Sequence, residues 1–582
     1  MNFADRDPAL RPLLDQLLSP DDRTRIEPVL DDLGAVAATE LDDLAATADR
    51  NPPVLRAYAP DGTRIDAVDH HPAYQEMCRL AFERYGLAAM SHRPGVLGWP
   101  TRVPHVVKYA LSYLFVQSEF GLACPLSMTD SAARVLRLFD PERFAAEIDA
   151  LSSPTLEGLA TGAMFMTEKQ GGTDVGQTAT TATATVTPEG THWTLSGHKW
   201  FCSNVAADLI LTLARVPGQG EGTRGLGLFL VPRVRPDGTP NGLRIDRLKD
   251  KLGSRSMASG EVTLEEAWAQ PVGDLTRGFP QMAEMLNVSR LSNAMRATAL
   301  MRRAVRESVD HTRERVVFGQ RLFDQPLMRQ TLLPLALHAE AGLGLVLESA
   351  SRLDDADAGD PHAAAMVRVL TPLAKNTLCK RARQVTGEAM EVRGGNGYIE
   401  DWVNPRLLRD AHLGSIWEGS SNVICLDVLR CMTREQSHRV LAGAYVGRLA
   451  ALDHPRVEPA ASTLVGRWQH LRSRGEQLLA MSRFDQEAAI GAYAEDLCHA
   501  VMATLLLERA QRELAAGLGH RALLLAHTWL HWLADPRLTS PPALHVLDQV
   551  VDGGEVSAEV AQSAYDAIGT ASRHHAEAGT RG

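Results

Sequence analysis

Thr181-Ala-Thr-Ala-Thr-Val-Thr187 alternates Thr with Ala or Val near the first third of the chain. A period of two places alternate side chains on opposite faces of an extended strand. The turn-forming residues Pro188-Glu189-Gly190 follow, and they lead into a second strand-like run at His192–Leu195. This stretch therefore predicts two neighbouring β-strands joined by a tight turn.

Three more strand-like runs follow in the same region. They are Leu209–Val216, Leu226–Val231 and Glu261–Glu265, and loops rich in Gly and Pro separate them. The sequence from about Met164 to Leu275 thus predicts five or more short antiparallel strands. That many short strands in one segment are typical of a small barrel or sandwich.

Helical apolar spacing flanks this β-region on both sides. The expected helices are Leu10–Leu18, Ile26–Leu44, Pro72–Arg84, Val106–Gly121, 280–317, 326–353, 361–390 and 422–434. Pro52-Pro53 and the turn Ala59-Pro-Asp-Gly62 interrupt the first group. The order of helices, then strands, then helices excludes a doubly wound dinucleotide-binding fold and predicts an α+β protein.

A further helical block is expected over 436–582. Loop signals interrupt it near Asp535–Pro542, including Pro541-Pro542, and at Gly553-Gly554, and the last ten residues are expected to fray. Together these patterns predict four domains, at 1–160, 161–278, 279–435 and 436–582.

The composition is that of an ordinary soluble protein. The 582 residues are 45% hydrophobic and 23% charged, and no run of about twenty apolar residues predicts a membrane span. The acidic first residues lack the apolar centre of a signal peptide. Seven cysteines are scattered without C-x-x-C pairs, so we expect a cytoplasmic protein without a disulfide framework or a structural metal site. The net charge of −11 opposes a protein that coats nucleic acid along its whole length.

Glu418 stands out in the run Ser415-Ile-Trp-Glu-Gly-Ser-Ser-Asn422. An aromatic residue precedes it and a turn follows it, which favours a buried setting. Burial of a carboxyl group raises its pKa toward the range that suits a general base. The alternative is helix capping, in which Ser420, Ser421 or Asn422 caps a helix that starts near Val423 and Glu418 favours its positive end.

Two segments of the β-region have the composition of a cofactor site. Met166–Asp174 contains a Gly-Gly pair between two Thr hydroxyls, which suits close approach to a phosphate or a flat heterocycle. Gly197–Asn204 combines adjacent aromatic residues with small polar ones, which suits ring stacking. The alternatives are a polar connector for the first segment and a strand with one buried aromatic residue for the second.

Three later segments are weaker signals. Arg315 and Gln320 in the run Arg313–Arg321 suit a pyrophosphate, although a solvated helix end has the same composition. The Gly-rich run Met390–Tyr398 does not match G-x-G-x-x-G, and no strand is expected before it. His527 and His531 lack the Glu of a metalloprotease helix and are expected to pack, while His574-His575 lies in the tail.

The order and spacing of these segments resemble one family. The matching runs are Met166-Thr-Glu-Lys-Gln-Gly-Gly-Thr-Asp174, Gly197-His-Lys-Trp-Phe201, Lys251-Leu-Gly-Ser-Arg-Ser256, Arg315-Val-Val-Phe-Gly-Gln320, Gly394-Gly-Asn-Gly-Tyr398, Leu407-Leu-Arg-Asp-Ala411 and Trp417-Glu-Gly-Ser420. Over about residues 70–435 the chain resembles the FAD-dependent acyl-CoA dehydrogenases. It is most similar to their AidB-like, adaptive-response branch. The features that suggest this branch are the longer runs Arg247–Ser256, Ala389–Tyr398 and Ser415–Arg430, the segment Asn51–Leu55 near the start, and the helical extension.

The resemblance implies a fold and a reaction. The fold is an N-terminal helical domain, a middle β-domain and a C-terminal four-helix bundle with a helical extension, with FAD bound where the domains meet. The position matching Glu418 removes the α-proton of an acyl thioester while a hydride leaves the β-carbon for flavin N5. The branch that places its base on the long bundle helix has Ser289 there in this chain, and Ser cannot replace a carboxylate.

The resemblance also implies the residues that hold the cofactor. They are Met166, Thr167, Gly172, Thr173, Phe201, Ser203, Arg315, Phe318, Gln320, Glu391, Gly395, Ser420 and Asn422. Arg315, Phe318 and Gln320 match a segment that reaches the cofactor of a neighbouring subunit, so a homodimer or homotetramer is implied. Glu391 replaces the commoner Gln, and its carboxylate would repel a pyrophosphate.

The resemblance implies an acyl-CoA substrate and an acceptor such as an electron-transfer flavoprotein. AidB-like proteins are also associated with the response to DNA alkylation and bind double-stranded DNA, so a DNA-binding flavoprotein with weak or vestigial dehydrogenase activity is the alternative. Duplex binding requires Arg or Lys contacts to phosphates. Residues 436–582 contain thirteen Arg, no Lys and sixteen Asp or Glu. Arg467, Arg472 and Arg474 form either a local basic patch or a solvated helix face.

Overall fold

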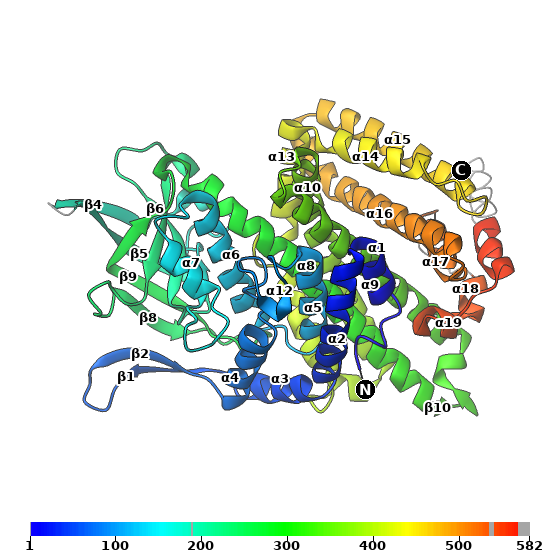
Figure 1. Cartoon of the computed structure of the whole chain (residues 1–582), viewed down its shortest axis with the longest axis horizontal. Helices are drawn as coiled ribbons and strands as arrows, with labels where there is room; N and C mark the ends of the chain where they lie inside the picture. Colours follow the sequence, from blue (N-terminus) through cyan, green and yellow to red (C-terminus); the bar gives the residue numbers. More distant parts are fainter. Residues whose placement is uncertain (1, 188–189, 535–540, 568–582) are drawn as a thin grey trace. The chain divides into compact units, whose positions relative to one another are not determined.

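The computed structural model describes residues 2–187, 190–534 and 541–567 (Figure 1). The chain divides into two compact units. One comprises Met1–Ala35 with Asn293–Gly582, and the other comprises Val36–Ser292. The second unit contains a helical region and a β-barrel, and the first contains a helical bundle with its extension.

The N-terminal part of the chain is mostly helical. Its helices are α1 (Leu10–Leu17), α2 (Pro20–Ala37), α3 (Glu40–Arg50), α4 (Pro72–Cys78), α5 (His105–Val116), α6 (Ala123–Phe139) and α7 (Ala145–Leu151). The single helix expected over Ile26–Leu44 is wrong, because the backbone leaves the helical region at Thr39 and α3 starts anew. The helix expected to Arg84 continues after α4 as a π-helix, η1 (Arg79–Arg84).

A β-hairpin in this part of the chain was not expected. Strands β1 (Val54–Tyr58) and β2 (Arg64–Asp69) pair antiparallel on either side of the predicted turn at Ala59–Gly62. Leu55 and Val68 pack against the hydrophobic core of the barrel. The hairpin therefore depends on a tertiary contact, which local spacing does not reveal.

The β-region forms a closed barrel. Its strands are β3 (Gly162–Phe165), β4 (Thr181–Thr187), β5 (Gly190–Ser203), β6 (Leu209–Arg215), β7 (Leu226–Pro232), β8 (Leu243–Leu248) and β9 (Ser259–Pro271). The order is β3-β6-β4-β5-β9-β7, β6–β7 pairing closes the ring, and β8 pairs with β9. This confirms the barrel and the bounds expected for β4. The turn expected at 188–190 falls partly on 188 and 189, outside the described residues.

Two details of the barrel differ from expectation. Strand β3 pairs parallel with β6, and β4 also meets β6 in parallel, so the sheet is mixed rather than antiparallel. Strand β5 also runs on past the expected His192–Leu195 through Gly197 to Ser203, so this segment is extended, as in the strand alternative. A Cβ on Gly197 would lie 2.3 Å from the Thr180 hydroxyl, so only glycine allows this close approach.

Three long helices pack together in the bundle: α8 (Gly278–Glu314), α9 (Pro326–Asp357) and α10 (Pro361–Val392). At Gly342 of α9 an added Cβ would lie within 3.4 Å of Thr298 and Met301 of α8 and of Leu378 of α10. The expected extension of α8 to Val317 is wrong. Strands β10 (Val316–Val317) and β11 (Gln320–Arg321) instead form a hairpin there.

The remaining helices complete the bundle and its extension. They are α11 (Gly395–Tyr398), α12 (Asn404–Gly414), α13 (Ser421–Glu435), α14 (Ser437–Ala450), α15 (Glu458–Ala480), α16 (Arg483–Ala515), α17 (Arg521–Ala534), α18 (Pro541–His545) and α19 (Leu547–Asp552). The loop expected at Pro541-Pro542 is wrong, since both residues start α18, where proline is tolerated. The break expected at 535–540, the frayed tail and His574-His575 lie outside the described residues.

Helix α16 joins the extension to the bundle, because it packs on α9, α10 and α13. Arg509 of α16 and Arg521 of α17 both bond to the buried Glu340 of α9. His527 packs as expected, with Nδ1 2.8 Å from the Ala561 carbonyl. By length and hydropathy α9 and α16 would pass for membrane spans, but 78% of each apolar window is buried inside the protein.

Among the described residues, which include all seven cysteines, no disulfide forms, and six of the seven side chains are buried. Cys202 lies in the barrel, Cys379 in the bundle and Cys498 in the extension.

Two buried histidines, His338 on α9 of the bundle and His499 on α16 of the extension, predict acid sensitivity. His338 and His499 pack against Trp529 and Trp532. Burial, then the Arg381 guanidinium, lowers the pKa of His338 well below its ordinary value, and the same causes lower the pKa of His499 to about 3. The unfolded chain therefore binds protons first as the pH falls below about 6.5. Stability is fully present above that pH and is lost as the pH falls toward 3.

Proton linkage predicts that each histidine lowers the free energy of unfolding by roughly 1.4 kcal/mol at pH 5.5. Urea unfolding at pH 7.5 and pH 5.5 measures it, with His338→Leu/His499→Leu as the comparison. The double variant is expected to lose about 3 kcal/mol less than the wild type between these pH values. Equal losses in both proteins would contradict this origin.

Candidate functional site

Glu418 lies in the turn between α12 and α13, on a strained backbone. Its φ is +55°, a region that residues other than glycine rarely adopt, and Gly419 follows with φ +101°. The Glu418 side chain is only 6% exposed. Its Oε2 accepts a hydrogen bond of 3.1 Å from Nδ2 of Asn293, and its Oε1 lies 4.0 Å from a guanidinium nitrogen of Arg296. The residue is thus a buried carboxylate in a polar setting.

The two residues beside Glu418 are also held by neighbouring helices. Trp417 donates its indole N–H to Oδ1 of Asn293 over 2.7 Å, and the Arg296 guanidinium lies 4.6 Å from the centre of its ring. The ammonium group of Lys375 on α10 donates to the Gly419 carbonyl. Three consecutive residues of the turn are therefore fixed by side chains from α8 and α10.

Helix capping does not explain this arrangement. Ser420 occupies the N-cap position of α13, but its side chain makes no capping hydrogen bond within the described part of the chain. Ser421 starts the helix, and the Glu418 side chain faces Asn293 instead of the first turn of α13.

The two candidate cofactor segments of the barrel are joined to each other. The backbone N–H of Trp200 donates to the Thr167 carbonyl over 2.8 Å. Beneath them, Lys199 donates to Glu168 over 2.8 Å, with side-chain exposures of 0% and 2%. Glu168 also accepts from the Thr180 hydroxyl and from the Ala179 N–H. A buried ion pair thus ties the Met166–Asp174 loop to strand β5.

The surface above this pair presents groups that suit a flat, phosphorylated cofactor. Phe201 is 57% exposed, which is unusual for a large aromatic side chain. Thr173 and Gly172 are exposed, whereas Met166, Thr167 and Ser203 are half-buried. An exposed ring, hydroxyl groups and the exposed backbone of Gly172 are the donors and stacking surface that a flavin nucleotide requires, whereas Gly171 is buried.

The other predicted residues lie on three separate segments of the bundle unit. Arg315, Phe318 and Gln320 lie in or beside the β10–β11 hairpin, where Phe318 and Gly319 both have positive φ, as a two-residue hairpin turn requires. Glu391 and Gly395 are exposed where α10 meets α11.

Ser420 and Asn422 are exposed at the start of α13. Within the Gly-rich run Met390–Tyr398, residues Gly395–Tyr398 form the short helix α11, which begins after Gly394 at φ +67°.

Asn293, Arg296 and Lys375 were not identified from the sequence. Asn293 lies one helical turn after Ser289 on α8, and Arg296 lies three residues further on. Positions separated by three or four residues share a helix face, so this spacing from Ser289 was the available signal.

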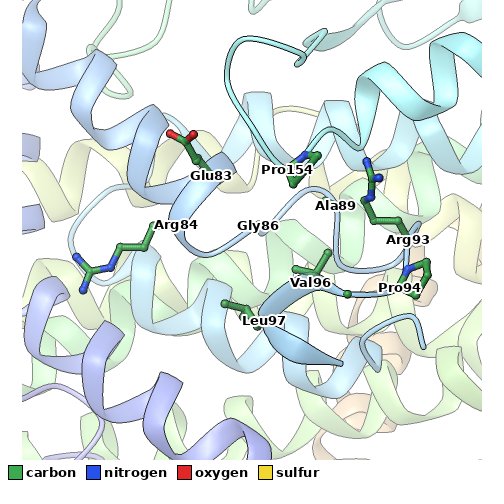
Figure 2. A pocket seen from close by; sticks show the side chains of 10 residues that line it. Glu83, Arg84, Gly86, Ala89, Arg93, Pro94, Val96, Leu97 and Pro154 are labelled. Atoms are coloured by element: carbon green, nitrogen blue, oxygen red, sulfur yellow. The ribbon is translucent and has the colours of Figure 1, made fainter. Parts of the chain in front are cut away.

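A cavity of about 270 Å³ lies elsewhere, in the helical region of the barrel unit (Figure 2). Figure 2 shows Val96, Leu97 and Pro94 on the loop that borders it, with Ala89 and Pro154 close by. Arg93 at its rim already donates to the Ser152 carbonyl. None of the predicted site residues lines this cavity.

Comparison with known proteins places the chain in a family. The model "Acyl-CoA dehydrogenase, C-terminal domain" matches residues 276–433, the middle-domain model matches 163–267, and "Adaptive response protein AidB N-terminal domain" matches 1–157. The Escherichia coli "Putative acyl-CoA dehydrogenase AidB" is 37% identical over 428 residues, which are 71% of this chain and 75% of that protein.

Solved structures agree with this match. Caenorhabditis elegans ACDH-11 in complex with C11-CoA superposes with a TM-score of 0.81 at 29% identity, covering 90% of each chain. An acyl-CoA dehydrogenase from Bacillus anthracis complexed with FAD has a TM-score of 0.66 at 16% identity and covers 96% of each chain, which shows the fold. The chain belongs to the acyl-CoA dehydrogenase family of FAD-dependent oxidoreductases, and within it to the AidB-like branch.

Proposed function

We propose that the protein catalyses α,β-dehydrogenation of an acyl-CoA thioester, with Glu418 as the base. The α-carbon loses a proton to the Glu418 carboxylate, the β-carbon loses a hydride, and a double bond forms between them. The observation that carries this proposal is the Glu418 turn. A buried carboxylate on a strained backbone, held by side chains from two helices, is typical of a catalytic position rather than of a surface acid.

Residues of this chain have the groups to hold FAD, which when bound would accept the hydride. In the barrel unit, Met166, Thr167, Gly172 and Thr173 would bind the ring edge and the diphosphate. Phe201 and Ser203 would lie against the ring. In the bundle unit, Gly395, Ser420 and Asn422 are the proposed contacts on the adenine and phosphate side, beside Glu391, whose carboxylate would repel the pyrophosphate. Arg315, Phe318 and Gln320 would reach the cofactor of a neighbouring subunit.

The backbone N–H of Glu418 is the proposed donor to the thioester carbonyl. A donor aimed at this oxygen stabilises the negative charge that develops as the α-proton leaves. The positive φ of Glu418 sets the direction of this N–H relative to its own side chain. One residue would therefore supply both the proton acceptor and a donor to the carbonyl.

Flavin bleaching by a panel of acyl-CoAs tests the proposed reaction. The C11-CoA complex of ACDH-11 makes a C11 acyl-CoA the first substrate to try, followed by shorter, longer and branched chains such as isovaleryl-CoA. We expect at least one to bleach the flavin band anaerobically, and an electron-transfer flavoprotein to reoxidise it. If none bleaches the band, the proposed reaction is wrong.

We further propose that the protein is a cytoplasmic homo-oligomer assembled through the β10–β11 hairpin. Phe318 at the tip is 98% exposed in the single chain, and Val316 beside it is also exposed. Leaving such side chains in water is unfavourable, since burial of a Phe contributes about 1.5–3 kcal/mol. A neighbouring subunit would cover the hairpin.

Phe318→Ser is expected to shift the protein toward smaller species and to weaken its retention of flavin. Sedimentation and the flavin-to-protein ratio measure the two effects. Phe484→Ser is the matched control, because Phe484 is also largely exposed but lies at the start of α16. A wild-type monomer, or equal effects of both substitutions, would refute this assembly.

Duplex DNA is the alternative partner, and the arrangement of charge in the extension does not favour it. Arg474 and Arg467 both pair with Asp496, and Arg439 pairs with Glu476. Arginines that are already paired contribute less to phosphate binding. An electrophoretic shift assay at low salt is expected to show no complex. A shift that rising salt abolishes would instead support the alternative.

A further inference from the structure

The side chain of Asn293 has one defined orientation beside the Glu418 turn. An indole N–H is only a donor, so the Trp417 hydrogen bond of 2.7 Å requires the carbonyl oxygen of the Asn293 amide. The NH₂ end must then point away from Trp417, and it lies 3.1 Å from Oε2 of Glu418. Asn293 is fully buried, so bulk solvent does not reach its amide.

We propose that Asn293 is a positioning residue for Glu418, an inference that rests on the proposed function of Glu418 as the base. Trp417 orients the amide, and the amide in turn fixes the carboxylate. Proton transfer requires the carboxylate and the α-carbon at near-contact distance, and small misplacements slow such steps strongly. The hydrogen bond from the Asn293 amide would hold the Glu418 carboxylate at that distance.

The strained backbone explains why such an anchor is needed. A non-glycine residue in the left-handed region costs on the order of 1–3 kcal/mol, and it persists only where its surroundings hold it. Glu418 has φ +55° and is followed by Gly419 at φ +101°. Without external contacts the turn would relax and carry the carboxylate with it.

Helix α10 provides the second half of the anchor. Lys375 donates to the Gly419 carbonyl. Cys379, one turn later, has its Sγ 3.7 Å from the main-chain carbonyl oxygen of Asn293. Burial raises the pKa of Cys379 to about 11, so its thiol keeps the proton that it donates. Helix α10 therefore contacts both the turn and the residue that anchors it.

Asn293→Asp is the most discriminating substitution. Aspartate has nearly the same size and still accepts from Trp417, but it removes the donor to Glu418 and places a second carboxylate beside it. We expect flavin reduction in the first turnover to slow by about 100-fold. The half-saturating acyl-CoA concentration and the bound flavin are expected to change little. Trp417→Phe, which removes the orienting N–H, should cause a smaller loss in the same direction.

Asn376→Asp is the matched control, since Asn376 is also a buried asparagine of the bundle but lies on α10. It introduces the same charge into the bundle, and the comparison is made per molecule of folded, flavin-loaded protein. We expect it to reduce flavin at nearly the wild-type rate. In an Asn293→Asp/Glu418→Gln double variant, the first substitution should cause no further loss. Equal losses in Asn293→Asp and Asn376→Asp would overturn the proposal.

Hydrogen exchange tests the positioning without any turnover. In Asn293→Asp and Asn293→Ala, amides of residues 415–420 should exchange faster, while peptides of the barrel exchange as in the wild type. Unchanged exchange at 415–420 would refute the anchor. If no acyl-CoA bleaches the wild-type flavin, the proposed reaction fails, but this measurement still decides whether Asn293 holds the turn.

Discussion

Glu418→Gln is expected to abolish flavin reduction by acyl-CoA while leaving the flavin bound. The amide keeps the size of the side chain but cannot take up the α-proton at neutral pH. A general base contributes between about 10²- and 10⁴-fold to a rate, so bleaching should slow by that range or become undetectable. Anaerobic stopped-flow absorbance measures the rate, and the spectrum of the resting protein measures the bound flavin.

Two outcomes would contradict the role of Glu418. Bleaching at the wild-type rate would show that another group takes the proton. Loss of flavin together with bleaching would show that Glu418 supports cofactor binding instead. Glu435→Gln at the end of α13 provides a control with the same chemical change in an exposed side chain, and it should bleach normally.

Lys199→Met is expected to destabilise the barrel by about 3–5 kcal/mol, because it leaves Glu168 buried without its cation. Burial alone would raise the pKa of Glu168, but the Lys199 ammonium holds it below its ordinary value, while burial lowers the pKa of Lys199. Urea unfolding measures the loss. The Met166–Asp174 loop contains Glu168, so flavin affinity should fall as well.

The double variant Lys199→Met/Glu168→Gln separates loss of the charge pair from loss of packing. Removing both charges of a buried pair often costs much less than removing one. The double variant should therefore recover a large part of the lost stability. If it is as unstable as Lys199→Met alone, the volume of the side chain matters more than its charge.

Local patterns predicted the regular elements well where one period dominates. Strand β4 has the expected bounds because its Thr residues alternate without interruption. The β1–β2 hairpin was missed because it forms with the help of Leu55 and Val68 packing on the barrel. Helix α8 ends before its expected residue because positive φ at Phe318 and Gly319 allows a hairpin that helical periodicity does not reveal.

The residues of the candidate site also fall into those that local sequence reveals and those that only the folded chain brings together. Glu418 was recognised from its neighbours in the sequence, since an aromatic residue and a Gly-Ser-Ser turn enclose it locally. Asn293 and Lys375 lie 125 and 44 residues away from their hydrogen-bond partners Glu418 and Gly419. Contacts over such separations exist only in the folded chain, and one sequence without relatives does not show which residues meet.

Chemical labelling of the buried cysteines would report how often the region around each of them opens. Burial raises the pKa of Cys498 to about 12 and that of Cys202 still further. Their reactive thiolates are therefore scarce near neutral pH, and a thiol reagent must wait for the surrounding structure to open. Labelling rates at Cys202, Cys379 and Cys498 would thus compare, in one unmodified molecule, how often the barrel, the bundle and the extension expose their interiors.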